Sequence, residues 1–185
     1  DTAYNILIDR HPFKDIWVTT GPLVDYFQAF LFKILGLNWQ SYIIHGSIIN
    51  SFITIYFFLT LVNFKLNLHL SFLYALALGI LCYTISGTPF AYIHSYVFSL
   101  LSILIFYSSV KFKSSRAFFF LPISMSLAFL SMQNPSTFIN FLILIFLLVF
   151  FLRKENRKFI YPLIAGSLTM LIVLILFFFI TEIPL

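Results

Sequence analysis

Charged side chains that could do chemistry gather in the first 38 residues of the chain. A carboxylate there could act as general base toward an acceptor hydroxyl or amine. Arg, Lys and His side chains beside it could hold a phosphate leaving group. The same charges could also do no more than solvate a surface loop, and both interpretations stay open. The acidic and basic residues of this segment are Asp1, Asp9, Arg10, Lys14, Asp15, Asp25 and Lys33.

Histidines beyond this segment add one further candidate. His94 is expected where a loop enters an apolar run, so it could be a catalytic partner, a phosphate ligand or a metal ligand, or a residue that hydrogen-bonds at a helix end. His45 is expected to be satisfied by a neighbouring helix, and His69 to lie near the cytoplasmic edge. No metal-binding spacing occurs, so no metal ligand is predicted, and the cofactor is left open with a divalent metal among the options. Gln133 opens a polar turn that could contact substrate.

The composition decides which kind of fold must position these groups. Of 185 residues, 61% are hydrophobic and only 9% are charged, where a soluble domain has about 25% charged residues. This excludes a soluble domain, a disordered chain and a disulfide scaffold. A transmembrane barrel would alternate polar and apolar residues, whereas the apolar runs here are unbroken. The sequence predicts an all-α, polytopic transmembrane helical bundle.

Six apolar runs are candidates for spans of about 20 residues. They form a predicted transmembrane region, 39–185, after a first loop, 1–38. The chain begins at Asp1 rather than Met, so we expect it to be a fragment. An extracytoplasmic first loop would in turn require a further span before Asp1. The predicted spans are 39–64, 66–86, 92–110, 117–132, 137–152 and 159–180.

Basic residues alternate between the predicted connections. Eight of the eleven Lys and Arg residues fall in three loops that would share one side, and the positive-inside rule makes that side cytoplasmic. Residues 1–38 and the end near Glu182 would then be extracytoplasmic, in a bacterial inner membrane. The eight residues are Lys65, Lys111, Lys113, Arg116, Arg153, Lys154, Arg157 and Lys158.

The first loop is predicted to contain two interfacial amphipathic helices. In the first, Asp1, Asn5 and Asp9 share one helical face, and His11-Pro12 ends it. The second runs from Leu23 to Leu35, with Gly21-Pro22 at its start and Gly36 at its end. Its apolar stripe is Val24, Phe27, Leu31 and Ile34, with Asp25, Gln28 and Lys33 off the stripe.

This loop resembles the first external loop of GT-C glycosyltransferases, in the branch of the protein mannosyltransferases and lipid A aminoarabinose transferases. Three segments carry the resemblance: Asp1-Thr2-Ala3-Tyr4 at the opening, Gly21-Pro22-Leu23 at the second helix, and Lys33-Ile34-Leu35-Gly36-Leu37-Asn38 at its end. Three positions depart from the family pattern. Thr2 replaces a Glu, Thr20-Gly21 replaces a Glu-Lys pair, and His94 stands roughly where the family has a second acidic residue.

The resemblance implies a membrane glycosyltransferase that moves a sugar from a polyprenyl-phosphate carrier to a lipid, glycan or protein acceptor. It makes Asp1 the candidate base. We expect an inverting single displacement, with His94 assisting and with Arg10, His11 and Lys14 on the leaving phosphate. Membrane lipids are expected partners, and nucleic acid is not. Asp9, Asp15 and Gln133 are further candidates.

Two other classes stay open. One is a non-catalytic transporter or flippase of lipid-linked sugars, which would need a polar path through the membrane. The spans carry no Asp, Glu, Lys or Arg in their interiors, which argues against coupled transport. The other is a polymerase or ligase of surface polysaccharide.

Overall fold

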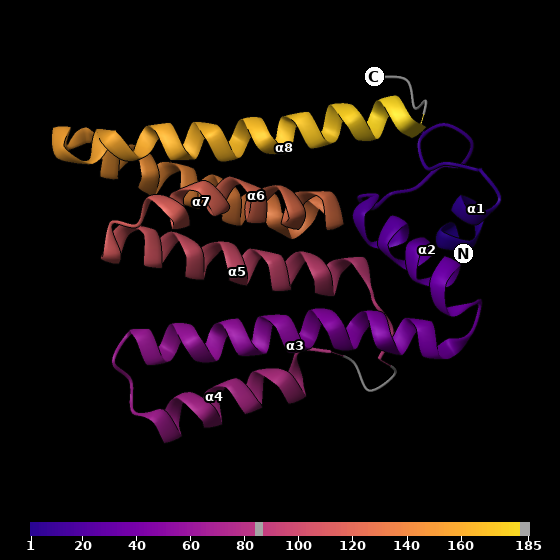
Figure 1. Ribbon diagram of the computed structural model, residues 1–185, viewed down its shortest axis with the longest axis horizontal. Coiled ribbons are helices and arrows are strands. Elements are labelled where there is room, and N and C mark those ends of the chain that lie inside the picture. The colour runs from indigo at the N-terminus through magenta and orange to yellow at the C-terminus, as the bar shows by residue number, and fades with distance from the viewer. Residues whose placement is uncertain (84–86, 182–185) are drawn as a thin grey trace.

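The computed structural model describes residues 1–83 and 87–181, and every regular element in these ranges is helical (Figure 1). Apolar helices occur at all six predicted places. The elements are α1 (Thr2–Leu7), α2 (Leu23–Leu35), α3 (Trp39–Asn63), α4 (Leu68–Leu81), α5 (Ala91–Phe112), α6 (Ser115–Ser131), α7 (Gln133–Leu152), the 3-10 helix η1 (Lys154–Phe159) and α8 (Ile160–Thr181).

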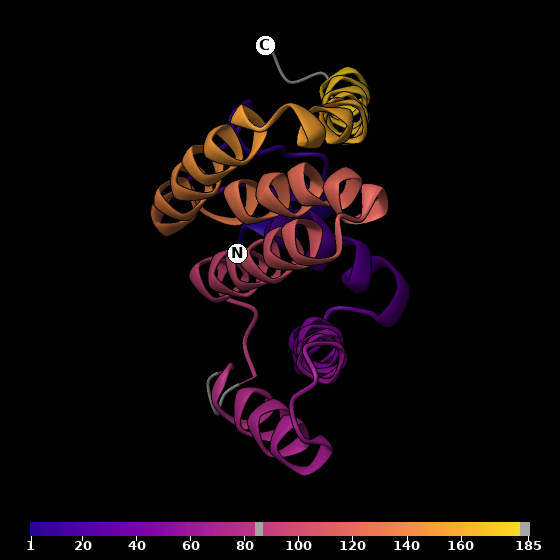
Figure 2. The same cartoon turned by 90° about the vertical axis from the view of Figure 1, so that its left-hand side faces the viewer.

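The long helices run side by side and α1 and α2 cover one end of them (Figures 1 and 2). Helix α8 forms one outer edge and α4 the other, with α5 and α6 between them. Helix α5 packs on α6 and α7 and is the most buried of the long helices. Its side chains supply much of the main core cluster, which includes Val97, Phe98, Leu101, Phe118 and Leu121. The core therefore lies around α5 and α6.

Four helical segments of the described chain are long and apolar enough to cross a membrane. They are Trp39–Asn63, Ala91–Phe112, Gln133–Leu152 and Lys154–Thr181. Helices α4 and α6 are apolar but have 14 and 17 residues. At about 1.5 Å per residue both are shorter than a hydrocarbon layer of about 30 Å. The structure thus supports a membrane protein, and full crossing by α4 and α6 stays a prediction. Residues 84–86 of the second predicted span, and Glu182, lie outside the described residues.

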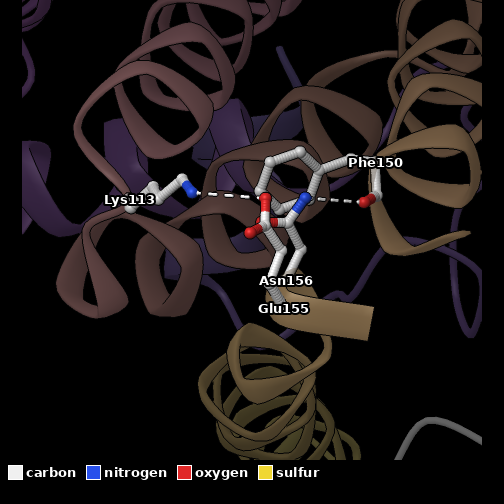
Figure 3. Close-up of polar contacts among 4 residues, drawn as sticks. All are labelled: Lys113, Phe150, Glu155 and Asn156. Carbon is white, nitrogen blue, oxygen red and sulfur yellow. Dashed lines mark hydrogen bonds and ion pairs between the residues drawn. The ribbon is translucent and has the colours of Figure 1, made fainter. Parts of the chain in front are cut away.

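The three basic loops meet at one end of the bundle, which we call the basic end (Lys65, 111–116 and 153–158). The ammonium of Lys111 lies 4.5 Å from the ring centroid of Phe64, which joins the α3 and α5 ends. The Lys113 ammonium lies 3.6 Å from a Glu155 carboxylate oxygen, and the Asn156 amide donates to the Phe150 carbonyl at 2.9 Å (Figure 3). These loops therefore share one end, as their alternation predicted.

The opposite end, which we call the histidine end, is formed by α1, α2 and the ends of α3, α5, α6 and α8. The Gly21 N–H donates to the Ser131 carbonyl at 3.1 Å. A Cβ on Gly21 would collide with the Leu130 carbonyl oxygen, so only glycine allows this approach to α6. On the neighbouring helix, the Ser95 hydroxyl donates to the Met132 carbonyl at 2.9 Å. The Gly21 contacts seat the first loop on the end of α6, and the Ser95 contact joins α5 to the connection between α6 and α7.

Helix α2 begins and ends where the sequence predicts. It follows Pro22, and Gly36 ends it with φ of 85°, a conformation that favours glycine. Its predicted stripe is only partly correct. Val24 and Leu31 are buried, whereas Ile34 is exposed and Gln28, predicted to lie off the stripe, is 2% exposed.

The first helix is shorter than predicted. Helix α1 ends at Leu7 rather than at His11-Pro12. Asp9 has φ of 57° and lies outside the helix, so the prediction that Asp1, Asn5 and Asp9 share one helical face is wrong. The helix ends in a left-handed cap at Asp9, where the Arg10 N–H donates to the Asn5 carbonyl at 3.0 Å.

The predicted polar turn at 133–136 is also displaced. Helix α7 begins at Gln133, and Asn134 interrupts its first turn with φ of −104° and ψ of 119°. Gln133 remains exposed, and its backbone carbonyl accepts from the Thr137 hydroxyl at 2.6 Å. The residue therefore lies on a helix end rather than in a free loop.

Candidate functional site

A buried pair of histidines lies at the histidine end. The Nε2 atoms of His45 on α3 and His94 on α5 are 3.0 Å apart. His45 is fully buried and His94 is 2% exposed. His94 lies in the first turn of α5, and its Nδ1 atom is 3.0 Å from the carbonyl oxygen of Phe90, the residue that precedes the helix. The prediction that a neighbouring helix satisfies His45 is confirmed, and its partner is the other candidate histidine.

Two further polar side chains complete this cluster. Gln28 of α2 places its Oε1 atom 2.8 Å from Nδ1 of His45. The hydroxyl of Tyr83 lies 3.3 Å from Nε2 of His94. The rings of Phe27 and Phe98 pack on the pair at centroid distances of 4.5 and 6.3 Å. The polar atoms are thus held inside an apolar shell, where hydrogen bonds are strong and an unpaired polar atom is costly.

Apolar space adjoins the pair. A cavity of about 130 Å³ is lined by His45 and His94 together with Leu23, Ile49, Phe98 and Leu127. A second hollow of about 370 Å³ shares Phe98 and Leu127 and continues between α3, α5 and α6 past Phe52 and Tyr56. Together they form what we call the apolar groove. Their mostly apolar lining suits a hydrocarbon chain rather than a polar solute.

Asp1, the predicted base, caps the first helix. Its Oδ1 atom accepts from the Ala3 N–H at 2.9 Å, which leaves the other carboxylate oxygen exposed. Helix α1 packs on α2 through Ala3, Ala29 and Phe32. The histidine pair instead contacts α2 through Phe27 and Gln28. Asp1 and His94 therefore share one end of the molecule but lie on different faces of α2.

Asp25 is the second carboxylate on the α1 side of α2. Partial burial, with the negative charge of Asp1 as the next cause, raises the pKa of Asp25 from 3.8 to about 6. A carboxyl with a pKa near the working pH is suited to general base catalysis. Sequence reasoning counted Asp25 among the charges and gave it no role. Its burial depends on how α1 folds over α2, which no spacing in the sequence shows.

His11 and Asp15, two of the predicted candidates, belong to one turn. Nδ1 of His11 lies 2.8 Å from the Tyr26 hydroxyl, and the two rings are stacked. Burial, followed by the nearby charge of Asp15, raises the pKa of Tyr26 to about 12. Tyr26 therefore stays protonated and can donate to His11. Phe177 of α8 packs edge-on against the Tyr26 ring at 4.7 Å, so the turn is seated on the bundle.

The remaining predicted residues lie on the surface of the same end. Arg10 and Lys14 are exposed in the segment between α1 and α2. Asp9 and Lys33 line a hollow of about 370 Å³ between α1 and α2, together with Tyr26 and Phe30. We call this the α1–α2 hollow. Its lining combines two charged side chains with two aromatic rings, which suit a polar group such as a sugar or an acceptor.

No group of three or more His, Cys, Asp or Glu side chains that could hold a metal ion occurs within residues 1–83 and 87–181. The histidine pair lacks a third such ligand, and a catalytic zinc site uses three protein ligands. The described residues therefore offer no recognisable metal centre.

Comparison with known proteins adds no family. No family model, no curated protein and no solved structure matches the chain. The site must therefore be interpreted from its own geometry.

Sequence reasoning missed the partners that make the site. His45 and His94 are 49 positions apart, so only the packing of α3 on α5 brings them together. The burial of Gln28 was missed because α2 buries two faces, one against α1 and one against the bundle, whereas a single apolar stripe was predicted. One signal was available: a polar residue inside an apolar span calls for a polar partner.

Proposed function

We propose that the protein is a membrane glycosyltransferase that moves a sugar from a polyprenyl-phosphate carrier to an acceptor at the histidine end. One observation carries the proposal. The apolar groove ends at the histidine pair, and the carboxylates and basic side chains of the first loop lie at this same end of the bundle, across α2. A lipid-linked phosphate sugar has this same polarity, with a hydrocarbon chain at one end and a charged head at the other.

The reaction would be a single displacement. The carboxylate of Asp1 or Asp25 takes the proton from the acceptor hydroxyl or amine. The acceptor atom bonds to the anomeric carbon as the bond from that carbon to the phosphate oxygen breaks, which inverts the anomeric centre. The electron pair leaves with the lipid phosphate. Asp25, with its pKa of about 6, is ionised at neutral pH and is a stronger base than an ordinary carboxylate.

The leaving phosphate needs positive charge or hydrogen-bond donors. Arg10, His11 and Lys14 lie in the segment that joins α1 to α2 and are the proposed phosphate ligands. His94 would assist from α5, on the side of α2 that faces the bundle. The acceptor would occupy the α1–α2 hollow, close to Asp9 and Lys33.

Transport of the same lipid is a weaker alternative. It would need a polar path along the spans, and the buried serines of α5 are the obvious candidates. Ser102 and Ser109 donate to carbonyls of their own helix at 2.8 and 2.7 Å. These hydroxyls therefore serve helix packing rather than a water-filled path.

The test measures sugar release from radiolabelled polyprenyl-phosphate sugars in membranes that contain the protein. Asp1→Asn and Asp25→Asn are compared with Glu155→Gln, which makes the same change at the basic end. Loss of the true base should slow release by about 100-fold or more, and Glu155→Gln should retain activity. Release that survives in both Asp variants refutes these bases. No release from any donor refutes the proposed function.

A further inference from the structure

With the Gln28 amide oriented as it is in the structure, the contacts of the histidine pair require a particular number of protons. The Phe90 carbonyl can only accept, so the Nδ1 atom of His94, 3.0 Å away, must bear a hydrogen. One more hydrogen must lie between the two Nε2 atoms, which are 3.0 Å apart. The last ring nitrogen, Nδ1 of His45, faces Oε1 of Gln28 at 2.8 Å and must also donate. Three N–H groups on two imidazoles amount to one proton more than the neutral pair holds.

A neutral pair needs a different orientation of Gln28. With two N–H groups, Nδ1 of His45 becomes an acceptor, and only the NH₂ group of Gln28 can then face it. This requires a half-turn of the amide, a change that barely alters its shape. In the observed orientation the Gln28 Nε2 atom is buried without a partner, and in the turned orientation Oε1 would be. Each orientation of the amide leaves one Gln28 atom unpaired, so neither is favoured on that count. The number of protons on the histidine pair therefore determines which orientation is adopted.

We infer that His45 and His94 form a single proton-binding site, and that release of its proton turns over the Gln28 amide. The proton is shared because the two rings are joined through one N–H···N hydrogen bond and exclude water. Tyr83 is the titratable side chain among the described residues that contacts the pair. The other neighbours from α2, α3, α5 and α6 are Leu23, Val24, Phe27, Ile49, Phe98 and Leu127, which are apolar. The site is therefore a proton-linked contact between α2 and the spans, and the inference needs no catalytic role for His94.

Imidazole nitrogen NMR tests this on the protein in lipid nanodiscs with ¹⁵N-labelled histidine. The chain has four histidines, and His11→Gln and His69→Gln identify the other two. We expect a nitrogen–nitrogen coupling across the Nε2···Nε2 bond. We also expect three N–H groups on the pair in acid and two in base, lost in one step of a titration from about pH 3 to pH 8, because an apolar shell opposes the charging of an imidazole. Independent uptake of one proton by each ring, or a constant number of N–H groups over this range, overturns the inference.

Gln28→Glu tests the link to α2. A carboxylate at this position can only accept, so the form with three N–H groups should gain about tenfold in population at a given pH. Gln40→Glu adds the same charge at an exposed position of α3 and should leave the pair unchanged. Equal behaviour of the two variants refutes the role of Gln28. The coupling in the wild-type protein needs no variant, so the inference stays testable if Gln28→Glu does not fold.

Discussion

The two ends of the bundle are held together by different forces. At the histidine end the contacts are short and buried: Gln28, His45 and His94 form one chain of hydrogen bonds, and Gly21 is seated directly on the backbone of α6. At the basic end the Lys113–Glu155 ion pair is 3.6 Å long, and its side chains are 53% and 65% exposed. Buried contacts depend on exact geometry, and exposed charges are screened by water. Substitutions should therefore cost more at the histidine end.

The largest expected effect is at Gly21. Gly21→Val would place a branched side chain on the Leu130 carbonyl, so the first loop would have to leave α6. We expect a loss of about 3 kcal/mol, or a fall in Tm of roughly 10 °C, measured by differential scanning fluorimetry. Thr19→Val places the same side chain at a neighbouring exposed residue and should have little effect. A Gly21→Val protein as stable as the wild type would show that the seating on α6 is wrong.

Replacement of Asp25 should increase the stability of the protein, and by an amount that depends on pH. Burial raises its pKa from 3.8 to about 6, so the folded state favours the protonated form. The resulting stabilisation is present below about pH 4 and is lost as the pH rises through 6. Asp25→Asn should therefore stabilise the protein near pH 8 by on the order of 1 kcal/mol, a figure reduced for its partial exposure, and should change little near pH 4.

Thermal unfolding at the two pH values measures this effect of Asp25→Asn. The matched change at the basic end, Glu155→Gln, concerns an exposed carboxylate and should leave Tm nearly unchanged at both. If the proposed function is right, Asp25→Asn also loses transfer activity while it gains stability, a combination that a merely structural role for Asp25 does not predict.

How much of this could be predicted from sequence depends on how local each signal is. Pro22 and Gly36 mark the ends of α2 through their own backbone preferences, and both ends were predicted correctly. The end of α1 depends on the left-handed conformation of Asp9, which the residue pattern did not indicate, so that end was not predicted. The contact of His45 with His94 is tertiary, and the partial burial of Asp25 depends on α1, an earlier element of the chain. The composition therefore predicts the apolar helices well. The site depends on how those helices pack, which the composition does not show.

A moderate effect is expected at Asn156, the exception at the basic end. Its side chain is 2% exposed and donates to the Phe150 carbonyl at 2.9 Å (Figure 3). Phe150 lies in the last turn of α7, where carbonyls have no partner within the helix. Asn156→Ala should therefore cost about 1 kcal/mol. Asn63→Ala, at an exposed helix end, is the control, and equal Tm values for both variants would contradict the capping role.

The smallest effect is expected for the ion pair of the basic end. Lys113→Ala and Glu155→Ala should each change the free energy of unfolding by no more than about 0.5 kcal/mol, because both side chains are largely exposed. A double-mutant cycle measures the coupling between them, and added salt should reduce it. A coupling of about 2 kcal/mol that persists in high salt would mean that the basic end is as tightly organised as the histidine end. The two ends would then differ in the kinds of side chain they use and not in how much their contacts contribute to stability. The buried Asn156 would be typical of the basic end.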